Sequence, residues 1–443
     1  MTARGTGWVA GAALVPWPVA SGTPLAGYAA RTGPATGTLD GLTVGALVLE
    51  REGARLALVA ADVVAVDAAL VGEVAAAAGL SPSELILCAS HTHAGPAGIV
   101  PRLHPAEPDR LDPRLRARFV GVCADAIAAA RRHLEPATMH VGRAETRGVA
   151  ANRNDPDGPC DPRLSVLAAR CGDGALLAVL VHFACHPTVL GAENRLVSAD
   201  FPGALRRSLA AELGDDPIVP VLFVNGAAAD VSTRFTRGGQ DAAEVQRIGA
   251  ALAVAASDAL GSARRVDGPL RHGRATVELA RRSVGGMGGD LAMARAALGG
   301  DPPGVLIDGE HRRAETRAQG AALLAGMAEI DPAVVPAGIE LDAWTLGDIA
   351  LVAIPGELTA ALGRRVADAG RLSPLILGYA NGYVGYLADR SAHAIGTYEA
   401  LASPYAADAG ERVAAAAATL VAGLLSADRT DRARFETGPS ASR

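Results

Sequence analysis

The chain has 443 residues, of which 50% are hydrophobic and 20% charged, which is ordinary for a soluble globular protein and argues against disorder. Its net charge of −6 gives no electrostatic indication of binding to nucleic acid or an anionic membrane. All 41 basic residues are arginine, so Schiff-base chemistry, a carbamylated-lysine metal bridge and a phosphate-loop lysine are excluded. The five scattered cysteines include no C-x-x-C pair, which argues against a disulfide framework or a cysteine zinc site.

The N-terminal run from Trp8 to Ala20 is apolar enough to suggest a signal peptide. However, Pro16 and Pro18 interrupt it, and only Arg4 supplies a positive charge before it. No stretch approaches about 20 uninterrupted apolar residues, the length that spans a bilayer. We therefore expect no transmembrane segment and a cytoplasmic location.

Short apolar runs alternate with helical patterns along the chain. The runs predict strands over residues 43–50, 55–61, 84–88, 138–145, 164–169, 176–184, 218–224, 339–344 and 349–354. The helical patterns cover residues 64–78, 114–134, 201–213, 242–260 and 406–425, and a further helix is expected to begin at Glu357. Residues 280–335 are predicted to be a helical insert or connector, and residues 426–443 a flexible tail. The alternation is typical of an α/β protein, whose sites usually lie where buried strands end.

Two histidines, His91 and His93, directly follow the predicted strand 84–88, and a turn rich in glycine and proline comes next. Residues two apart on a strand project from the same face, so the two imidazoles can reach one target together. This arrangement is typical of the rim of a metal or proton-transfer site. The alternative is a surface loop that contains two histidines.

Two further residues at element boundaries can act as ligands. His186 ends the apolar run 176–184, where a histidine is either a ligand or a hydrogen-bonded structural residue. His182, inside that run, is interpreted as a core histidine. Glu357 is either a carboxylate ligand or an acidic residue that stabilises the first turn of a helix, and the two roles are compatible.

The tyrosines are unevenly distributed, because five of the six fall between residues 379 and 405. We interpret them as a wall that presents hydroxyl groups to a ligand or metal, with an aromatic mini-core as the alternative. Arg153 can stabilise an oxyanion or be a solvated surface residue. Ser232, near Asp230, can be a nucleophile, a hydrogen-bonding residue for substrate or a helix cap. No G-x-S-x-G elbow surrounds Ser232, so a serine-hydrolase mechanism is not favoured.

These motifs, taken together and in order, resemble those of the neutral/alkaline (non-lysosomal) ceramidases, which are zinc-dependent amidases that cleave the N-acyl bond of ceramide. The resemblance covers about residues 5 to 405. The motifs that carry it are Ser90-His91-Thr92-His93-Ala94-Gly95-Pro96, Asn152-Arg153, Phe183-Ala184-Cys185-His186, Ser198-Ala199-Asp200, Asn225 with Asp230-Val231-Ser232, Pro355-Gly356-Glu357, and the spacing of Tyr386 and Tyr398.

The resemblance implies mixed β-sheets with flanking helices and one catalytic domain over residues 1–425, which the apolar N-terminus opens. It implies a zinc site made of His91, His186, Glu357 and Tyr386. Around the scissile amide it places His93, Arg153, Ser232 and Tyr398.

The chemistry of this set is consistent in itself. Two neutral imidazoles, a carboxylate and a phenolate suit Zn²⁺ and leave room for water, whose pKa zinc lowers to roughly 7. We expect zinc-bound hydroxide to attack an N-acyl amide of a small molecule or a sphingolipid-like lipid. His93, Arg153 and Tyr398 would stabilise the oxyanion, and His93 or Glu357 would carry the proton to the leaving amine.

Two other functions remain open from the sequence. One is a cyclic amidohydrolase on a (β/α)₈ barrel, in which an H-x-H pair also binds metal; the late position of this pair and the lack of lysine disfavour it. The other is a catalytically retired metal- or lipid-binding protein of the ceramidase fold.

Overall fold

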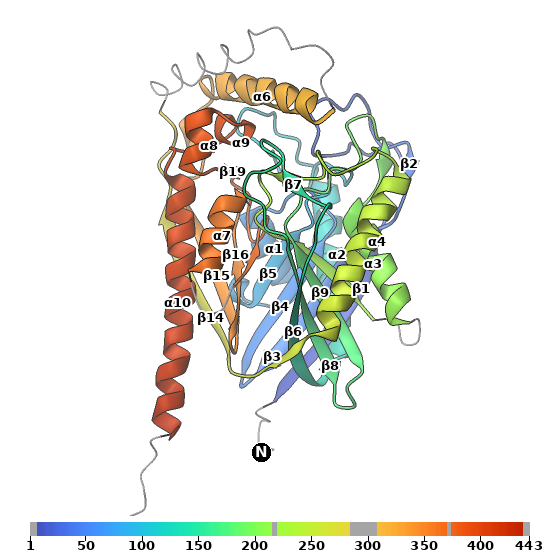
Figure 1. The fold of residues 1–443 in the computed structure, drawn as a ribbon, viewed down its shortest axis with the longest axis vertical. Helices are drawn as coiled ribbons and strands as arrows, with labels where there is room; N and C mark the ends of the chain where they lie inside the picture. Colours follow the sequence, from blue (N-terminus) through green and yellow to red (C-terminus); the bar gives the residue numbers. More distant parts are fainter. Residues whose placement is uncertain (1–6, 215–218, 284–307, 370–373, 437–443) are drawn as a thin grey trace, which may run out of the picture.

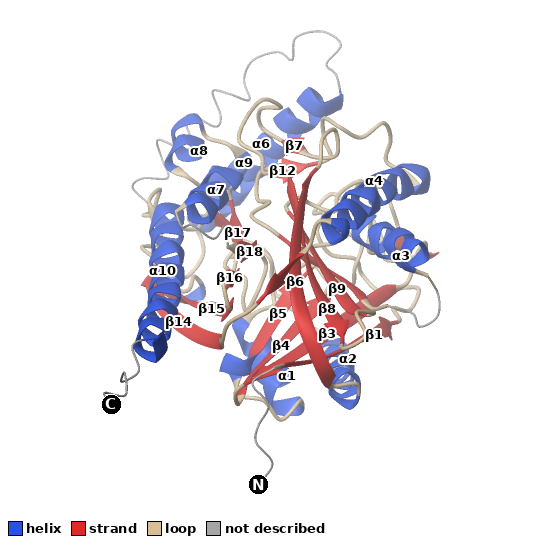
Figure 2. Ribbon diagram, turned by 60° about the horizontal axis from the view of Figure 1, so that its bottom comes forward, coloured by secondary structure: helices blue, strands red, loops and turns tan. Residues whose placement is uncertain are grey.

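The structure is a computed structural model that describes residues 7–214, 219–283, 308–369 and 374–436. Two β-sheets pack face to face, and helices cover the outer face of each sheet, which gives four layers (Figures 1 and 2). The predicted α/β class with mixed sheets and flanking helices is confirmed. The described strands form open sheets rather than an eight-stranded parallel barrel, so the cyclic amidohydrolase alternative is wrong.

The larger sheet has the strand order β11-β9-β8-β6-β1-β3-β4-β5, and β13 pairs with β6. Its strands are β1 (Trp8–Trp17), β3 (Leu42–Arg51), β4 (Ala54–Ala61), β5 (Leu85–Ala89), β6 (Glu135–Glu145), β8 (Arg163–Cys171), β9 (Leu176–Phe183), β11 (Val221–Asn225) and β13 (Arg264–Val266). The pairs β4–β5 and β9–β11 are parallel. Alternate residues of β3 serve two cores, because Leu47 and Leu49 face the smaller sheet whereas Ala46 and Val48 face the helices.

The smaller sheet has the order β14-β15-β16-β18, in which β16 and β18 are parallel. Its strands are β14 (Leu270–Glu278), β15 (Gly338–Leu346), β16 (Ile349–Ala353) and β18 (Leu375–Leu377). Three two-stranded pieces lie outside both sheets. They pair β2 (Gly37–Thr38) with β10 (Leu196–Val197), β7 (Ala151–Asn152) with β12 (Val231–Ser232), and β17 (Glu357–Leu358) with β19 (Tyr386–Leu387).

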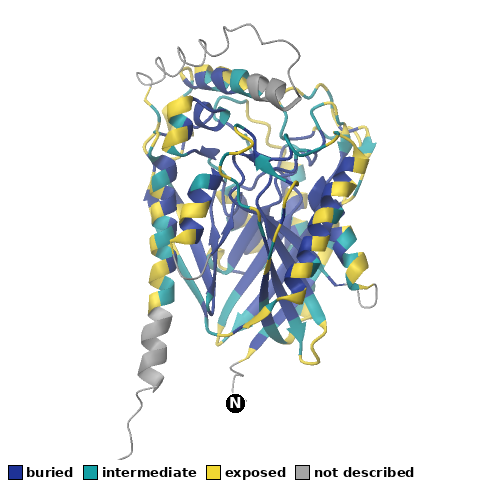
Figure 3. Cartoon of the chain, in the orientation of Figure 1, coloured by how far each residue is buried: buried dark blue, intermediate teal, exposed yellow. Residues whose placement is uncertain are grey.

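The helices on the larger sheet are α1 (Ala68–Ala77), α2 (Pro113–Arg132), α3 (Phe201–Leu213) and α4 (Ala242–Gly261). Each begins after an aspartate whose side chain accepts a hydrogen bond from the backbone of the first turn. The smaller sheet is covered by α7 (Ala360–Asp368) and α10 (Ala409–Glu436). The remaining helical elements are α6 (Asp308–Met327), α8 (Arg390–Ile395), α9 (Tyr398–Leu401) and the short η1 (Pro82–Glu84) and η2 (Pro332–Val334). Figure 3 shows buried strands between helices that expose one side to solvent.

Several boundaries differ from the prediction. The helix α1 begins at Ala68 because Asp67 caps it, so residues 64–67 are not helical. Glu357 lies in β17 and not in the first turn of a helix, because it pairs with β19 before α7 begins at Ala360. The last helix, α10, continues to Glu436 and so extends into the predicted tail, of which residues 437–443 lie outside the described part of the chain.

The predicted insert, residues 280–335, includes residues 284–307, which lie outside the described part of the chain. Its helix α6 lies across the top of the molecule in Figure 1 and packs on α9 through Leu324 and Leu401. Thr316 and Gln319 of α6 line the cavity at the candidate site. The predicted insert or connector therefore contributes to the walls of that cavity.

The helix α10 contains an 18-residue stretch, Ala409–Ser426, that is long and apolar enough by composition alone to cross a membrane. In the structure it packs on the smaller sheet through Val413, Ala417 and Val421, and 33% of the stretch is buried. The absence of a transmembrane segment stays a prediction.

Candidate active site

The polar residues singled out in the sequence meet at one end of the two sheets. His91 follows β5, His186 follows β9, and Ser232 lies in β12. Glu357 and Tyr386 are direct partners in the pairing of β17 with β19. The strands β5 and β9 lie near opposite ends of the strand order of the larger sheet, but the sheet curls so that β11, the neighbour of β9, contacts β5. This curvature brings residues far apart in sequence together here.

The backbone at His91 is unusual, because φ is +69° at a residue that has a bulky side chain. Two carbonyl groups hold it in this conformation. The His91 amide donates to the Val63 carbonyl at 3.0 Å, and Nδ1 of the ring lies 2.7 Å from the Val64 carbonyl. A left-handed residue that is held so firmly is a mark of functional sites.

Backbone carbonyl groups also determine which ring nitrogens face the site. Nδ1 of His91 donates to Val64, and Nδ1 of His186 donates to the Ala228 carbonyl at 2.6 Å. In a neutral imidazole the other nitrogen then carries a lone pair. Nε2 of His186 is buried and has no hydrogen-bond partner among the described residues. Both histidines thus present an Nε2 lone pair to the same space, as metal-binding histidines do.

His93, which was predicted to contact the substrate, lies close to His91 and His186. Its Nε2 atom is 3.2 Å from Nε2 of His91, and its ring makes an edge contact with Tyr28. One ring nitrogen from each of His91, His93 and His186 lies within 4.8 Å of the others, which is close enough for one metal ion. Three histidines are therefore available as ligands.

The carboxylate of Glu357 completes this cluster. Its Oε2 atom lies 3.2 Å from Nε2 of His186 and 3.6 Å from Nε2 of His91, and the side chain is 1% exposed. Tyr379 and Tyr383 donate their hydroxyl groups to the two carboxylate oxygens. The wall of hydroxyl groups expected from the tyrosine cluster therefore holds the acid in place, and Tyr379 also stacks on His91 at 4.0 Å between ring centroids.

A second group of side chains lies beside the histidines. Nη2 of Arg153 donates to the Tyr386 hydroxyl at 3.3 Å, and the guanidinium lies over the rings of Tyr386 and Tyr398 at 5.8 and 5.3 Å. Ser232 and His186 form an isolated β-bridge through their backbones. A small cavity of about 70 Å³ is lined by His93, Arg153, Ser232, Tyr386 and Tyr398 among other residues.

Burial shifts the pKa values of the three histidines and of Tyr386 and Tyr398. It lowers the pKa of His91 to about 3 and holds those of His93 and His186 well below the usual range. It raises the pKa of Tyr386 well above its usual value and that of Tyr398 to about 12. The imidazoles are therefore neutral near pH 7, as ligands must be, whereas a phenolate at Tyr386 requires the charge of a bound cation.

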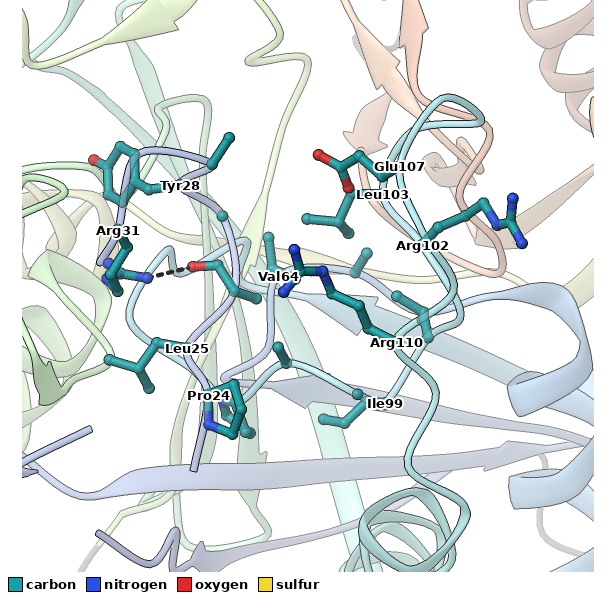
Figure 4. A pocket seen from close by; sticks show the side chains of 18 of the residues that line it. Pro24, Leu25, Tyr28, Arg31, Val64, Ile99, Arg102, Leu103, Glu107 and Arg110 are labelled. Atoms are coloured by element: carbon teal, nitrogen blue, oxygen red, sulfur yellow. Dashed lines mark hydrogen bonds between the residues drawn. The ribbon is translucent and has the colours of Figure 1, made fainter. Parts of the chain in front are cut away.

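A larger cavity of about 530 Å³ adjoins the small one, and both are lined by Gly27 and Tyr28 (Figure 4). Its walls are partly apolar and come from residues 22–34, 63–65 and 96–110. Arg110 points into this cavity, whereas Arg102 points away from it (Figure 4).

The eight predicted site residues thus lie in one region. The structure brings three of the predicted ligands, His91, His186 and Glu357, into mutual contact, and it places Tyr386 beside them against Arg153. Sequence reasoning missed Glu399, which forms an ion pair with Arg153, and it gave Tyr379 and Tyr383 no individual role. The density of tyrosines indicated the last two, but no local pattern distinguished Glu399.

A family model described as neutral/alkaline non-lysosomal ceramidase, N-terminal, matches residues 17–225. The match covers 209 of the 443 residues, and over this part the chain is similar to that family. The matched residues include His91, His93, Arg153 and His186. Ser232, Glu357, Tyr386 and Tyr398 lie beyond them, so their assignment depends on the resemblance of the motifs and on the structure.

Solved ceramidase structures have the same fold. Neutral ceramidase from Pseudomonas aeruginosa superposes with a TM-score of 0.75 at 20% sequence identity, covering 96% of this chain and 75% of that one. A ceramidase complexed with C2 superposes with a TM-score of 0.73 at 19% identity, covering 95% of this chain and 75% of that one. No curated protein sequence matches the chain. At these identities the superpositions establish the fold alone.

Proposed function

We propose that this protein is a ceramidase-like, zinc-dependent amidase that hydrolyses a linear N-acyl amide, with sphingolipid-like amides as the leading substrate class. The observation that carries the proposal is the convergence of two buried Nε2 lone pairs with the Glu357 carboxylate, next to Arg153 and Tyr398. Without a cation, the unpartnered Nε2 of His186 would be a buried polar atom with no compensation.

The donor set fits zinc, which prefers nitrogen and carboxylate oxygen ligands. His91, His186 and Glu357 would hold the ion, and zinc bound there supplies a Lewis acid that acidifies water and polarises a carbonyl group. The assignment of Tyr386 as the fourth ligand, and of His93 to substrate and not to metal, stays a prediction because the His93 nitrogen lies in the same cluster.

The chain's own residues supply the remaining steps. As the amide carbonyl is attacked, its oxygen gains negative charge, and the Arg153 guanidinium and Tyr398 hydroxyl are positioned to donate hydrogen bonds to it. Such donors contribute about 3 kcal/mol each in comparable sites. His93, neutral and at the edge of the small cavity, accepts a proton and passes it to the leaving amine. Ser232 hydrogen-bonds the substrate in the same cavity.

The two adjoining cavities suit an amide with an apolar part. The small polar cavity accommodates the amide group, and the walls of the larger one, which include Leu25, Val64, Ile99 and Leu103, accommodate an acyl chain. Tyr28 lies between the two and lines both.

Metal content and amidase activity of the purified protein test the proposal. We expect one zinc per chain and hydrolysis of N-acyl amides that chelation abolishes and added zinc restores. His91→Ala and His186→Ala should lose both zinc and activity. His182→Asn is the matched control, because His182 is also buried, in β9, but its Nε2 atom lies 2.8 Å from the Ile376 carbonyl and outside the cluster.

Two outcomes would contradict the proposal in different ways. If the protein contains no zinc, and His91→Ala binds added metal as well as the parent does, the metal site is wrong. If zinc is bound stoichiometrically but no N-acyl amide is turned over, although such lipids bind tightly, the protein is a retired binding protein of this family.

A further inference from the structure

One buried carboxylate in the site has no part in the chemistry described so far. Glu399 is fully buried, and both of its oxygens are used. Oε1 accepts a hydrogen bond from Nε of Arg153 at 2.7 Å, and Oε2 accepts one from Nδ2 of Asn154 at 2.8 Å. Two consecutive side chains of the loop after β7 therefore bind one carboxylate.

Glu399 connects the two segments that carry the proposed oxyanion donors. It lies in the first turn of α9, directly after Tyr398, whereas Arg153 comes from the loop after β7. With Nε of Arg153 bound to Glu399, the Nη2 atom on another part of the guanidinium reaches the Tyr386 hydroxyl. The carboxylate thus sets the direction in which the guanidinium points.

The charges support the same role. Arg153 is 7% exposed, so its guanidinium needs an anionic partner in place of water. Besides burial, the positive charge of Arg153 lowers the pKa of His91, His93 and His186. A divalent cation bound among these histidines would repel the guanidinium. Glu399 forms a direct ion pair with Arg153 and therefore holds the guanidinium close to a site where a cation is expected.

We infer that Glu399 is a positioning residue, which, with Asn154, holds the Arg153 guanidinium in the orientation that serves the scissile carbonyl. The inference depends on the proposed amidase function for its kinetic consequence but not for its structural one. The hydrogen bonds of the Glu399 carboxylate go to Arg153 and Asn154 and not to the proposed metal ligands.

The helix α9 has anchors that do not involve Glu399, so a variant at this position should fold. Thr397 caps the helix by accepting from the Ala400 amide. The Ala400 carbonyl accepts from Nη1 of Arg282 at 2.7 Å, and the Ala402 carbonyl accepts from His104 at 3.0 Å. Removing one charge therefore tests orientation and not the presence of the helix.

The test is the kinetics of Glu399→Gln, which keeps the size of the side chain but removes its charge. We expect kcat to fall about 30-fold, a part of the effect of losing an oxyanion donor, with KM changed less than about twofold. Glu399→Asp should restore part of kcat. In a protein that already carries Arg153→Gln, the further change Glu399→Gln should lower kcat less than about threefold, because Glu399 acts through Arg153.

Asp62→Asn provides the matched control. It weakens another buried arginine–carboxylate pair, in which Arg206 donates to both oxygens of Asp62 and neither residue lines the small cavity. We expect this variant to lower Tm while kcat stays at the parental value. Glu399→Gln should instead lose much of its kcat, while its Tm falls by no more than that of Asp62→Asn.

A crystal structure of Glu399→Gln separates the two proposals. If Arg153 leaves the Tyr386 hydroxyl, the positioning role holds even where the parent protein hydrolyses no amide, and only the amidase function fails. If the parent is active and Glu399→Gln keeps its kcat, or if Arg153 does not move, the positioning role is overturned. The positioning role would also be overturned if the loss of kcat in the double variant equals the product of the losses in Glu399→Gln and Arg153→Gln.

Discussion

At the scale of the residue, burial lowers the pKa of several histidines in this protein, and backbone groups determine which ring nitrogen carries the proton. His91 donates from Nδ1 to a carbonyl group and keeps a lone pair on Nε2. His104, outside the metal cluster, is fully satisfied as a neutral ring, because Nε2 donates to the Ala402 carbonyl and Nδ1 accepts from the Ala106 amide. Protonation of Nδ1 would break the second of these bonds, and burial lowers the pKa of His104 to about 4.

His104→Gln should therefore flatten the dependence of stability on pH. The pKa of His104 rises from about 4 in the folded protein to about 6.5 on unfolding, so the unfolded chain binds the extra proton first and stability falls as pH drops below about 6.5. Between pH 7 and pH 5 the parent should lose about 2 kcal/mol more than the variant. Urea denaturation of both at the two pH values measures this. Parallel losses would show that His104 is not held neutral.

Gly27 has no side chain, which allows the His93 ring to pack against its backbone. Its φ is +95°, and an added Cβ would lie 2.4 Å from Cγ of His93. Gly22, on the same connection, has a φ of +89° but open space around it. The two glycines share the backbone strain that a side chain would bring, and only Gly27 has the steric conflict.

Gly27→Ala and Gly22→Ala should therefore each lose about 1 kcal/mol of stability from the unfavourable backbone conformation. Gly27→Ala should in addition displace His93 and lower kcat at least about tenfold, an effect that a shift of about 1 Å in a catalytic group can produce. Gly22→Ala should keep the parental kcat. Equal activity in the two variants would show that His93 does not depend on this close approach.

At the scale of the element, the sequence predicted the strands well and the short pairings poorly. The strands β3, β4, β8 and β9 match their predictions within a few residues, because their apolar runs are bounded by clear turns. The pairing of β17 with β19 involves only two residues from each segment. A two-residue strand has no periodicity to detect, so Glu357 was assigned to a helix.

The candidate site shows the same limit. His91 and His186 were predictable because each follows a long buried strand. Glu399 was not, because its partner Arg153 lies 246 positions away and an isolated glutamate in a short helix has no distinctive pattern. Contacts of this range become visible only when the tertiary fold brings them together.

At the scale of the whole molecule, the candidate ligands join both sheets. His91 and His186 follow strands of the larger sheet, whereas Glu357 follows β16 of the smaller one. A bound ion would therefore connect the two sheets at one end of the core between them, and binding to the folded state alone stabilises that state.

Removal of the metal should lower the stability of the entire protein. With free zinc at about 1,000 times its Kd, the linkage is worth about 4 kcal/mol, or a shift in Tm of about 4 °C for a chain of this size. Differential scanning calorimetry with and without chelator measures the shift. His91→Ala should have the Tm of the chelator-treated parent protein, both with and without chelator. If chelator leaves the Tm of the parent protein unchanged, a zinc site that joins the two sheets is contradicted.

The parallel pairing of β17 with β19 also has a consequence for biosynthesis. Residues 1–225 contain the three clustered histidines and Arg153, but Glu357, Tyr386, Tyr398 and Glu399 are translated later. A ribosome-bound chain that ends before residue 357 can expose imidazoles to metal, yet it has neither the acid nor the phenols that the proposed turnover needs. Hydrolysis should therefore begin only after residues 357–399 have been synthesised, and two separately expressed halves should be inactive until they reassociate.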